Sequence, residues 1–548
     1  MTVPRPRITS RCILAVCLAA VLSPAGAAFA SPPNATAPRP GGHTAARSSP
    51  DLSRDTLAVV GPRAITAEDL VKRIEWMPFD GAGGPGGMDS TKVRALQSLV
   101  GEALLSQEAH RQGLGEGGRI ARMIASLRRA LARDALYREV TRGVTAPAAE
   151  VERIVSARAP RARPPARATL RKAVSDSLAA LARRDRAARF MEGALRGQRV
   201  EVDSATFMLL ADSLRALMAE RRAGDGAGRG HPLDPGDVDV LLSLLAPHLE
   251  RPIARLPDGP LTLGDALEDL RYYSFFIRSL APRRFAVELS MKFREVVEAE
   301  LMAREALRRH LDARPEVRAD LEMWSGAWRG RLLLERVAAG AAATEDEALR
   351  RMAVFEPQRA RQACEVDVEE VLSATEADAG RVRAELDSGA RFDSLARART
   401  SRAEWRGSGG RSGFFRVALR PGLGTAALLA PLDSLRGPVR LPEGSSVFRV
   451  LGKRLTPDSA ATRTAVERHM DAITAARRSE WVARRTAEIA ADTPPAIRYE
   501  RLPSLEILDT RMVTRRTLGF GGGMLAAPGL PPLWEWVRMW RPGRPALP

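Results

Sequence analysis

The sequence predicts an α-rich multidomain protein that contains two copies of a helical module and one small α+β domain. Apolar residues recur at helical spacing in long segments such as residues 90–112. A strand, a turn and a Thr-capped helix near Leu57 recur about 196 residues later, near Leu256. Residues 363–456 instead begin and end with alternating apolar runs, which are typical of half-buried strands.

The N-terminal residues are typical of a secretory signal peptide. Three arginines precede an apolar run at residues 12–22, and Ala30 closes an A-x-A cleavage site. The run is too short for a stable membrane span. We therefore expect export to the periplasm, with cleavage of residues 1–30. Residues 31–56, rich in Pro, Ala, Ser and Gly, are then a flexible linker.

Charge and cysteine content exclude several classes of function. The formal net charge of +19 falls to +16 without the three signal arginines, and the cations are scattered along helices rather than gathered in one patch. Aromatic residues are 5% of the chain, and no nucleic-acid-binding motif is present, so we expect no nucleic-acid partner. Only Cys364 survives signal cleavage, which leaves no internal disulfide and no zinc ligand set. We expect no metal and no cofactor.

The two helical modules are predicted at residues 57–160 and 251–362, with a helical connector at residues 161–250. In each copy a threonine, Thr66 or Thr262, caps the first helix. The long helix of the second copy can be aligned with that of the first, which places Leu301 on Leu104. We interpret the repeat as a duplication, with chance similarity between helices rich in Ala, Arg, Leu and Glu as the alternative.

The small domain has a distinctive order of elements. A strand with Val366 and Val368 is followed by a helix that Thr375 caps, a second short helix and a Gly-rich loop at residues 407–413. Phe415, a short apolar helix, and two strands joined by a turn at residues 442–444 complete the domain.

This order resembles the parvulin (PpiC-type) peptidyl-prolyl isomerase domain. The matching motifs are residues 386–396 (LDSGARFDSLA), 409–415 (GGRSGFF) and 435–439 (LRGPV). The resemblance implies a four-stranded sheet and an apolar pocket for a proline ring. The pocket positions are Phe415, Leu419, Leu423 and Leu428; ordinary core packing is the alternative role of these side chains.

The two histidines that active parvulins usually carry are missing. Glu370 takes the first position and Ser446 the second, and a loop position that is often Asp or Cys falls near Ala403 or Glu404. Rotation about an X-Pro bond must pass a barrier of roughly 18–20 kcal/mol, and it needs neither a nucleophile nor a metal. An ionised glutamate cannot donate a hydrogen bond. We therefore expect weak or absent isomerase activity with retained peptide binding, and an active isomerase remains the alternative.

The helical modules resemble the N-terminal chaperone domain of the SurA/PpiC family. The matching motif is residues 103–114 (ALLSQEAHRQGL). In that family the helices form a cradle for unfolded chains. The resemblance implies a periplasmic folding factor whose partners are unfolded or proline-containing exported polypeptides.

The C-terminal part contains a basic amphipathic helix, within residues 457–500, that is expected to pack on a helical module. Residues 501–548 form a Gly/Pro/Trp-rich tail, in which Trp534, Trp536 and Trp540 lie beside arginines. These tryptophans are suited to weak contact with a membrane surface or to covering a groove of the same protein. An assembly scaffold associated with the outer membrane is therefore a further alternative.

Overall fold

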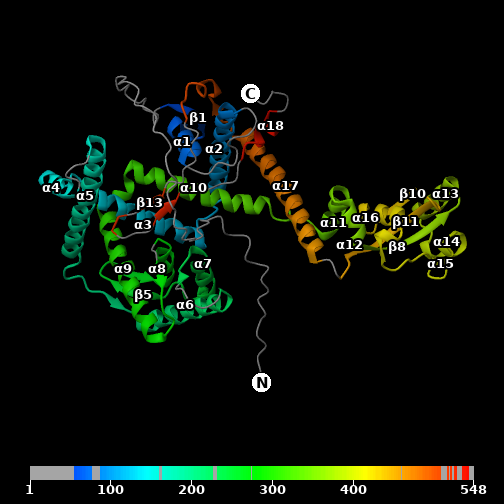
Figure 1. Ribbon diagram of the computed structural model, residues 1–548, viewed down its shortest axis with the longest axis horizontal. Coiled ribbons are helices and arrows are strands. Elements are labelled where there is room, and N and C mark those ends of the chain that lie inside the picture. The colour runs from blue at the N-terminus through cyan, green and yellow to red at the C-terminus, as the bar shows by residue number, and fades with distance from the viewer. Residues whose placement is uncertain are drawn as a thin grey trace. The chain divides into compact units, whose positions relative to one another are not determined.

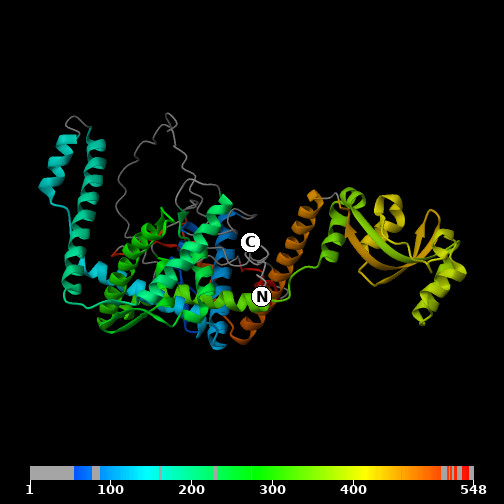
Figure 2. The ribbon, with the colours of Figure 1, turned by 90° about the horizontal axis from the view of Figure 1, so that it is seen from below.

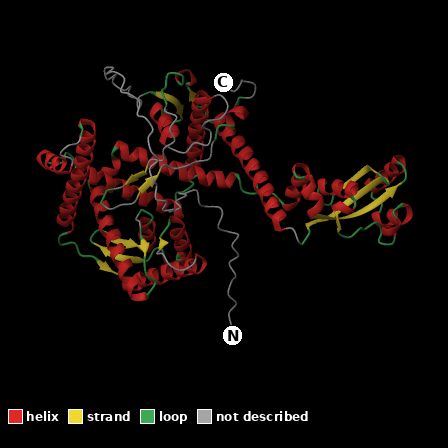
Figure 3. Cartoon of the chain, in the orientation of Figure 1, coloured by secondary structure: helices red, strands yellow, loops and turns green. Residues whose placement is uncertain are grey.

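The computed structural model describes residues 55–76, 87–158, 163–225, 231–272, 275–457, 460–507, 515–517, 519–520, 524–526 and 533–541. The predicted signal peptide and nearly all of the predicted linker lie outside these residues. The described part of the chain is rich in helices, with short strands and one larger sheet (Figure 3), which confirms the predicted fold class. It divides into two compact units, one that joins residues up to Leu333 with those from Ile489 onward, and one of Leu334–Glu488.

The first copy of the helical module begins with a hairpin. Thr66 ends the hairpin and accepts a hydrogen bond from the Asp69 N–H at 3.2 Å, so the next helix starts there. The elements of this copy are β1 (Thr56–Val60), β2 (Arg63–Thr66), α1 (Ala67–Val71), the π-helical turn η2 (Lys72–Trp76), α2 (Gly87–Arg111), α3 (Gly118–Val140) and α4 (Ala148–Arg158) (Figure 1). The first helix of the predicted connector, α5 (Pro164–Leu195), follows them.

The second copy repeats this plan. Thr262 caps its first helix by accepting from the Asp265 N–H at 3.1 Å, and both hairpins have a register shift at the same place. The elements within the residues predicted for this copy are β5 (Pro252–Leu256), β6 (Gly259–Thr262), α8 (Leu263–Leu270), α9 (Pro282–Arg308), α10 (Pro315–Val337) and α11 (Glu345–Phe355), of which α11 belongs to the second unit. The predicted duplication is thereby confirmed.

The segment predicted as a helical connector also contains strands. Its elements are β3 (Glu201–Val202), α6 (Ser204–Asp225), β4 (His231–Pro232) and α7 (Pro235–Leu244), and β4 pairs with β7 (Phe276–Ile277). Leu210 and Leu214 of α6 and Leu241 of α7 are buried in one cluster with the second hairpin and α9. The connector is therefore part of the core around the second copy.

The two copies exchange their third strands. β12 (Ala496–Ile497), which follows the helices of the second copy, pairs with β1, so that Ile497 faces Ala58. β3, which follows the helices of the first copy, pairs with β5, so that Val202 faces Ala254. Each hairpin is thus completed by the strand that follows the other copy.

The long helices are exchanged in the same way. α3 of the first copy packs along α8 and α9 of the second, where Arg129 lies 3.1 Å from both Asp269 and Glu300. α10 of the second copy lies against α2 of the first, and a Cβ on Gly326 would come 2.6 Å from Ser106 Oγ. The two copies therefore form one intertwined unit rather than two consecutive domains. Figure 2 shows α4 and α5 running side by side.

The second unit contains the predicted four-stranded antiparallel sheet, in the order β10-β11-β8-β9. Its strands are β8 (Cys364–Ser373), β9 (Phe415–Arg416), β10 (Leu435–Leu441) and β11 (Gly444–Leu455). Its helices are α11, α12 (Pro357–Ala363), α13 (Glu376–Asp387), α14 (Phe392–Arg399), α15 (Ala403–Arg406), the short 3-10 turn η5 (Val417–Leu419), α16 (Pro421–Leu429) and most of α17 (Ala460–Asp492).

Strand alternation buries both faces of this sheet. Val366, Val368 and Leu372 of β8 pack with α11 and α16 on one face. Val371 of β8 and Val447 of β11 pack with α13 and α14 on the other face. Polar side chains on either face must therefore find partners inside the domain.

The remaining described elements follow α17. They are the 3-10 turn η6 (Tyr499–Arg501), the paired strands β13 (Arg515–Thr517) and β14 (Met524–Ala526), and α18 (Trp536–Trp540). Across the described ranges, no helix has both the length and the apolar character needed to cross a membrane.

Candidate functional site

The structure brings together the two positions predicted for the missing histidines. Glu370 lies on β8 on the same face as Val368. Ser446 of β11 pairs with Leu372, two residues from Glu370, so it is a diagonal neighbour of Glu370 on that face. Both side chains are fully buried. The Ser446 hydroxyl donates a hydrogen bond to Glu370 Oε1 at 2.7 Å. The polar pair therefore sits inside the sheet face that α16 covers.

Arg402 is the third member of this polar group. Its Nε donates to Glu370 Oε2, and its Nη2 donates to Glu370 Oε1 at 3.3 Å. Arg402 is itself buried, and its guanidinium carbon lies 4.8 Å from the centroid of the Trp405 ring. The charge of the buried glutamate is thus neutralised by an equally buried cation.

Sequence reasoning placed the third loop position near Ala403 or Glu404 and did not identify Arg402. Glu404 instead forms an ion pair with Arg420 nearer the surface. A glutamate at a buried strand position requires a cation nearby. This requirement is the one feature of the sequence that predicts an arginine beside Glu370. It does not select among the several arginines of residues 397–411.

The Gly-rich loop holds this group in place from the side of β8. The Glu370 N–H donates to the Gly410 carbonyl at 2.8 Å. Gly410 has φ +89°, and a Cβ there would lie 2.7 Å from the Glu370 carbonyl oxygen. Only glycine tolerates both this positive φ and the close approach of the β8 backbone, which explains the glycine at position 410 of the loop motif.

The residues predicted to line a proline pocket lie in two environments. Leu423 and Leu428 are buried in the core between α16 and the sheet. Leu419, at the end of η5, is 72% exposed. Phe415 is partly buried, with its ring centroid 5.9 Å from that of Trp405. Trp405 is a further aromatic wall that the sequence analysis did not single out.

The chemistry available at this group is hydrogen bonding and charge neutralisation. Both Glu370 carboxylate oxygens accept hydrogen bonds from neighbouring side chains, and a carboxylate has no proton to donate. In the described parts of the chain, no three His, Cys, Asp or Glu side chains are placed together so that they could hold a metal ion.

Comparisons with known proteins give matches among solved structures alone. No protein-family model and no curated protein matches the chain. The peptidylprolyl isomerase PrsA from Bacillus anthracis matches with 18% identity over 31% of this chain and 73% of that chain, with a TM-score of 0.18. A PpiC-type peptidyl-prolyl cis-trans isomerase domain matches with 27% identity over 17% of this chain and 95% of that domain, with a TM-score of 0.17.

A third match is a structure of Campylobacter jejuni proteins described as two structurally related SurA-like chaperones, PEB4 and Cj1289. It matches with 15% identity over 47% of this chain and 99% of that chain, with a TM-score of 0.19. The descriptions of these structures include a PpiC-type isomerase domain and SurA-like chaperones, which are the two kinds of protein that the sequence resembles.

Proposed function

We propose that this chain is an exported protein-folding factor of the SurA/PpiC kind. It binds unfolded polypeptides, and its parvulin-like domain binds proline-containing segments without accelerating their isomerisation appreciably. The observation that carries the proposal is the buried group of Glu370, Ser446 and Arg402, in which Glu370 and Ser446 take the positions that the resemblance assigns to the two parvulin histidines.

The buried group explains the expected loss of catalysis. An isomerase must favour the twisted amide over the planar one. The Glu370 carboxylate is already occupied by Ser446 and Arg402, and it offers no donor to a bound amide. The group therefore acts as a structural bridge between β8, β11 and the loop before α15.

Binding of unfolded chains is supported by apolar side chains that remain exposed on the parvulin-like domain. They are Phe414, Leu419, Leu429 and Leu432. Exposed apolar side chains are suited to contacts with the apolar residues of an unfolded polypeptide. Such binding requires neither ATP nor a cofactor. Location in the periplasm rests on the predicted signal peptide, which lies outside the described residues.

The proposal is tested by light scattering of an aggregating client protein. The chain without residues 1–30, mixed in equimolar amount with a chemically unfolded client, should reduce the scattering that follows dilution of the denaturant. A serum albumin at the same mass concentration controls for nonspecific crowding. Scattering equal to that of the albumin control contradicts the proposed function.

A further inference from the structure

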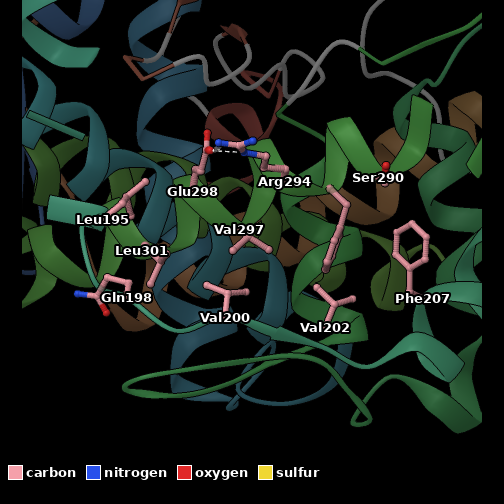
Figure 4. A pocket seen from close by; sticks show the side chains of 11 residues that line it. Leu195, Gln198, Val200, Val202, Phe207, Ser290, Arg294, Val297, Glu298 and Leu301 are labelled. Atoms are coloured by element: carbon pink, nitrogen blue, oxygen red, sulfur yellow. Dashed lines mark hydrogen bonds and ion pairs between the residues drawn. The ribbon is translucent and has the colours of Figure 1, made fainter. Parts of the chain in front are cut away.

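An apolar groove lies beside the long helix α9 of the second copy. It has a volume of about 350 Å³ and is bounded by the end of α5, by β3, by the start of α6 and by α9. Figure 4 shows Val200 and Val202 along one side, the ion pair of Arg294 with Glu298 along the other, and Val297 between them. The groove is open to solvent from the side of the two exposed valines.

The first copy has an equivalent face, and the strand registers identify it. Val202 pairs with Ala254 of the second hairpin, as Ile497 pairs with Ala58 of the first. Next to them, the Asp203 N–H donates to the Ile253 carbonyl at 3.0 Å and the Arg498 N–H donates to the Leu57 carbonyl at 2.8 Å.

The long helices extend this equivalence to the groove. The alignment that places Leu301 on Leu104 also places Arg294 on Gln97 and Glu298 on Gly101. The face of α2 around Gln97 and Gly101 therefore corresponds to the α9 side of the groove.

In the first copy this face is covered by the chain's own C-terminal segment, residues 533–541. The Leu533 N–H donates to Ser98 Oγ at 3.1 Å, and the Trp536 indole N–H donates to the Gln97 carbonyl at 3.1 Å. Trp536 is 1% exposed. A Cβ on Gly101 would lie 3.0 Å from Trp536 Nε1, so the missing side chain allows the tryptophan to approach α2 closely.

The second copy differs from the first at the position of this close approach. Gly101 is replaced by Glu298, which pairs with Arg294 at 2.8 Å, and the two charged side chains occupy the position of the close approach. The apolar floor at Val297 and the exposed valines remain uncovered in the described chain. One of two equivalent faces is thus closed by a Leu- and Trp-bearing segment, and the other is open.

We propose that the open groove binds a short client segment with a large apolar side chain, as residues 533–541 bind the equivalent face of the first copy. This inference rests on the proposed function, because it identifies where a client is held. The large apolar side chain would lie on Val297 between Val200 and Val202. Polar groups of the segment would meet the rim formed by Arg294 and Glu298, as the Trp536 N–H meets the Gln97 carbonyl.

The test measures binding of a fluorescent peptide with the sequence of residues 533–541 to the chain without residues 1–30. Val202→Glu should weaken binding at least about tenfold, because a carboxylate would then be desolvated against an apolar ligand. Val240→Glu is the matched control, since Val202 and Val240 are both 46% exposed and Val240 lies on α7, outside the groove. The control should bind like the unmodified chain. Equal binding by both variants overturns the proposal.

A second variant tests the equivalence of the two faces. Truncation after Pro532 removes the segment that covers α2, and calorimetric titration should then show two bound peptides per chain instead of one. A single bound peptide in a truncated chain that keeps its helical circular dichroism overturns the equivalence.

Failure of the groove is distinguishable from failure of the proposed function. If the Val202→Glu variant binds the peptide normally and the unmodified chain suppresses aggregation, the groove is not the binding site, and the proposed function as a folding factor is retained. Selective loss of peptide binding in Val202→Glu, without any suppression by the unmodified chain, supports the groove and overturns the proposed function.

Discussion

Glu370 lies at a position where an apolar side chain would be expected from strand alternation. An isolated buried carboxylate costs several kcal/mol of desolvation, and Arg402 and Ser446 offset that cost through hydrogen bonds to both carboxylate oxygens. Stacking on Trp405 places the Arg402 guanidinium against an aromatic face. The four side chains therefore depend on one another, which leads to a test by substitution.

Removing one charge of the Glu370–Arg402 pair should destabilise the domain much more than removing both charges. Glu370→Met leaves Arg402 buried and unpaired, and Arg402→Met leaves Glu370 in the same state. Each should lower the free energy of unfolding of the second unit by about 3–5 kcal/mol. The double variant should lose clearly less than the sum. Denaturant unfolding followed by circular dichroism measures this, and additive losses would show that the two charges do not stabilise each other.

The sequence predicts part of this site. The family motifs place Glu370 and Ser446 correctly as neighbours, since strand order and register follow from the motif spacing. The partner Arg402 could not be selected because several loop arginines are equivalent by sequence. Leu419, which the resemblance assigns to the pocket, is 72% exposed. Exposure at the end of a short turn depends on packing that residue type does not determine.

Helix starts are the elements that the sequence predicts best. Thr66, Thr262 and Thr375 each accept a hydrogen bond from a backbone N–H in the first turn of the following helix. A threonine followed three residues later by an acidic residue is a local signal, so distant contacts do not change it.

The two-residue strand β3 shows the opposite case. Glu201 and Val202 have no periodicity to detect, and they form a strand only because a distant hairpin pairs with them.

The capping box of α11 should make the second unit sensitive to acid. The Thr344 backbone N–H, followed by Arg477, lowers the pKa of Glu347 below its ordinary value of 4.5. A lowered carboxyl pKa contributes stability that is present above the ordinary value and is lost as pH falls through the lowered value. Thr344→Ala should cost about 1 kcal/mol at neutral pH.

Urea unfolding at neutral pH and below pH 4.5 checks the capping prediction. Glu347→Gln is the control, because it should remove the acid-dependent part contributed by this group and keep the threonine cap. An unchanged acid dependence in Glu347→Gln would contradict the role assigned to Glu347.

At the scale of the whole molecule, the duplication could be predicted and the exchange could not. The repeat is visible in the sequence because both hairpins and both long helices keep their patterns. The two candidate third strands are short and similar, however, and nothing local decides which hairpin each one completes. Helix packing decides it, since α3 lies on α8 and α9 while α10 lies on α2.

Engineered cysteine pairs test the exchange. Facing residues in adjacent antiparallel strands lie at Cα distances that a disulfide can bridge. Val202→Cys with Ala254→Cys, and Ala58→Cys with Ile497→Cys, should form disulfides within one chain on mild oxidation.

The unexchanged combinations serve as controls. Val202→Cys with Ala58→Cys, and Ala254→Cys with Ile497→Cys, should stay reduced. Cys364 should not compete, because burial raises the pKa of its thiol to about 12. Disulfides in the unexchanged pairs, seen as mobility shifts on nonreducing gels, would show that each copy closes on itself.

The central claim, that the chain holds clients but does not isomerise their prolines, is tested most directly by refolding of a small protein limited by one X-Pro bond. Uncatalysed isomerisation takes roughly 10–100 s at 25 °C, so a slow phase is easily followed by fluorescence. We predict that the chain without residues 1–30 leaves the rate constant of that phase unchanged while it lowers the aggregated fraction. A slow phase that accelerates in proportion to the concentration of the added chain would contradict the claim.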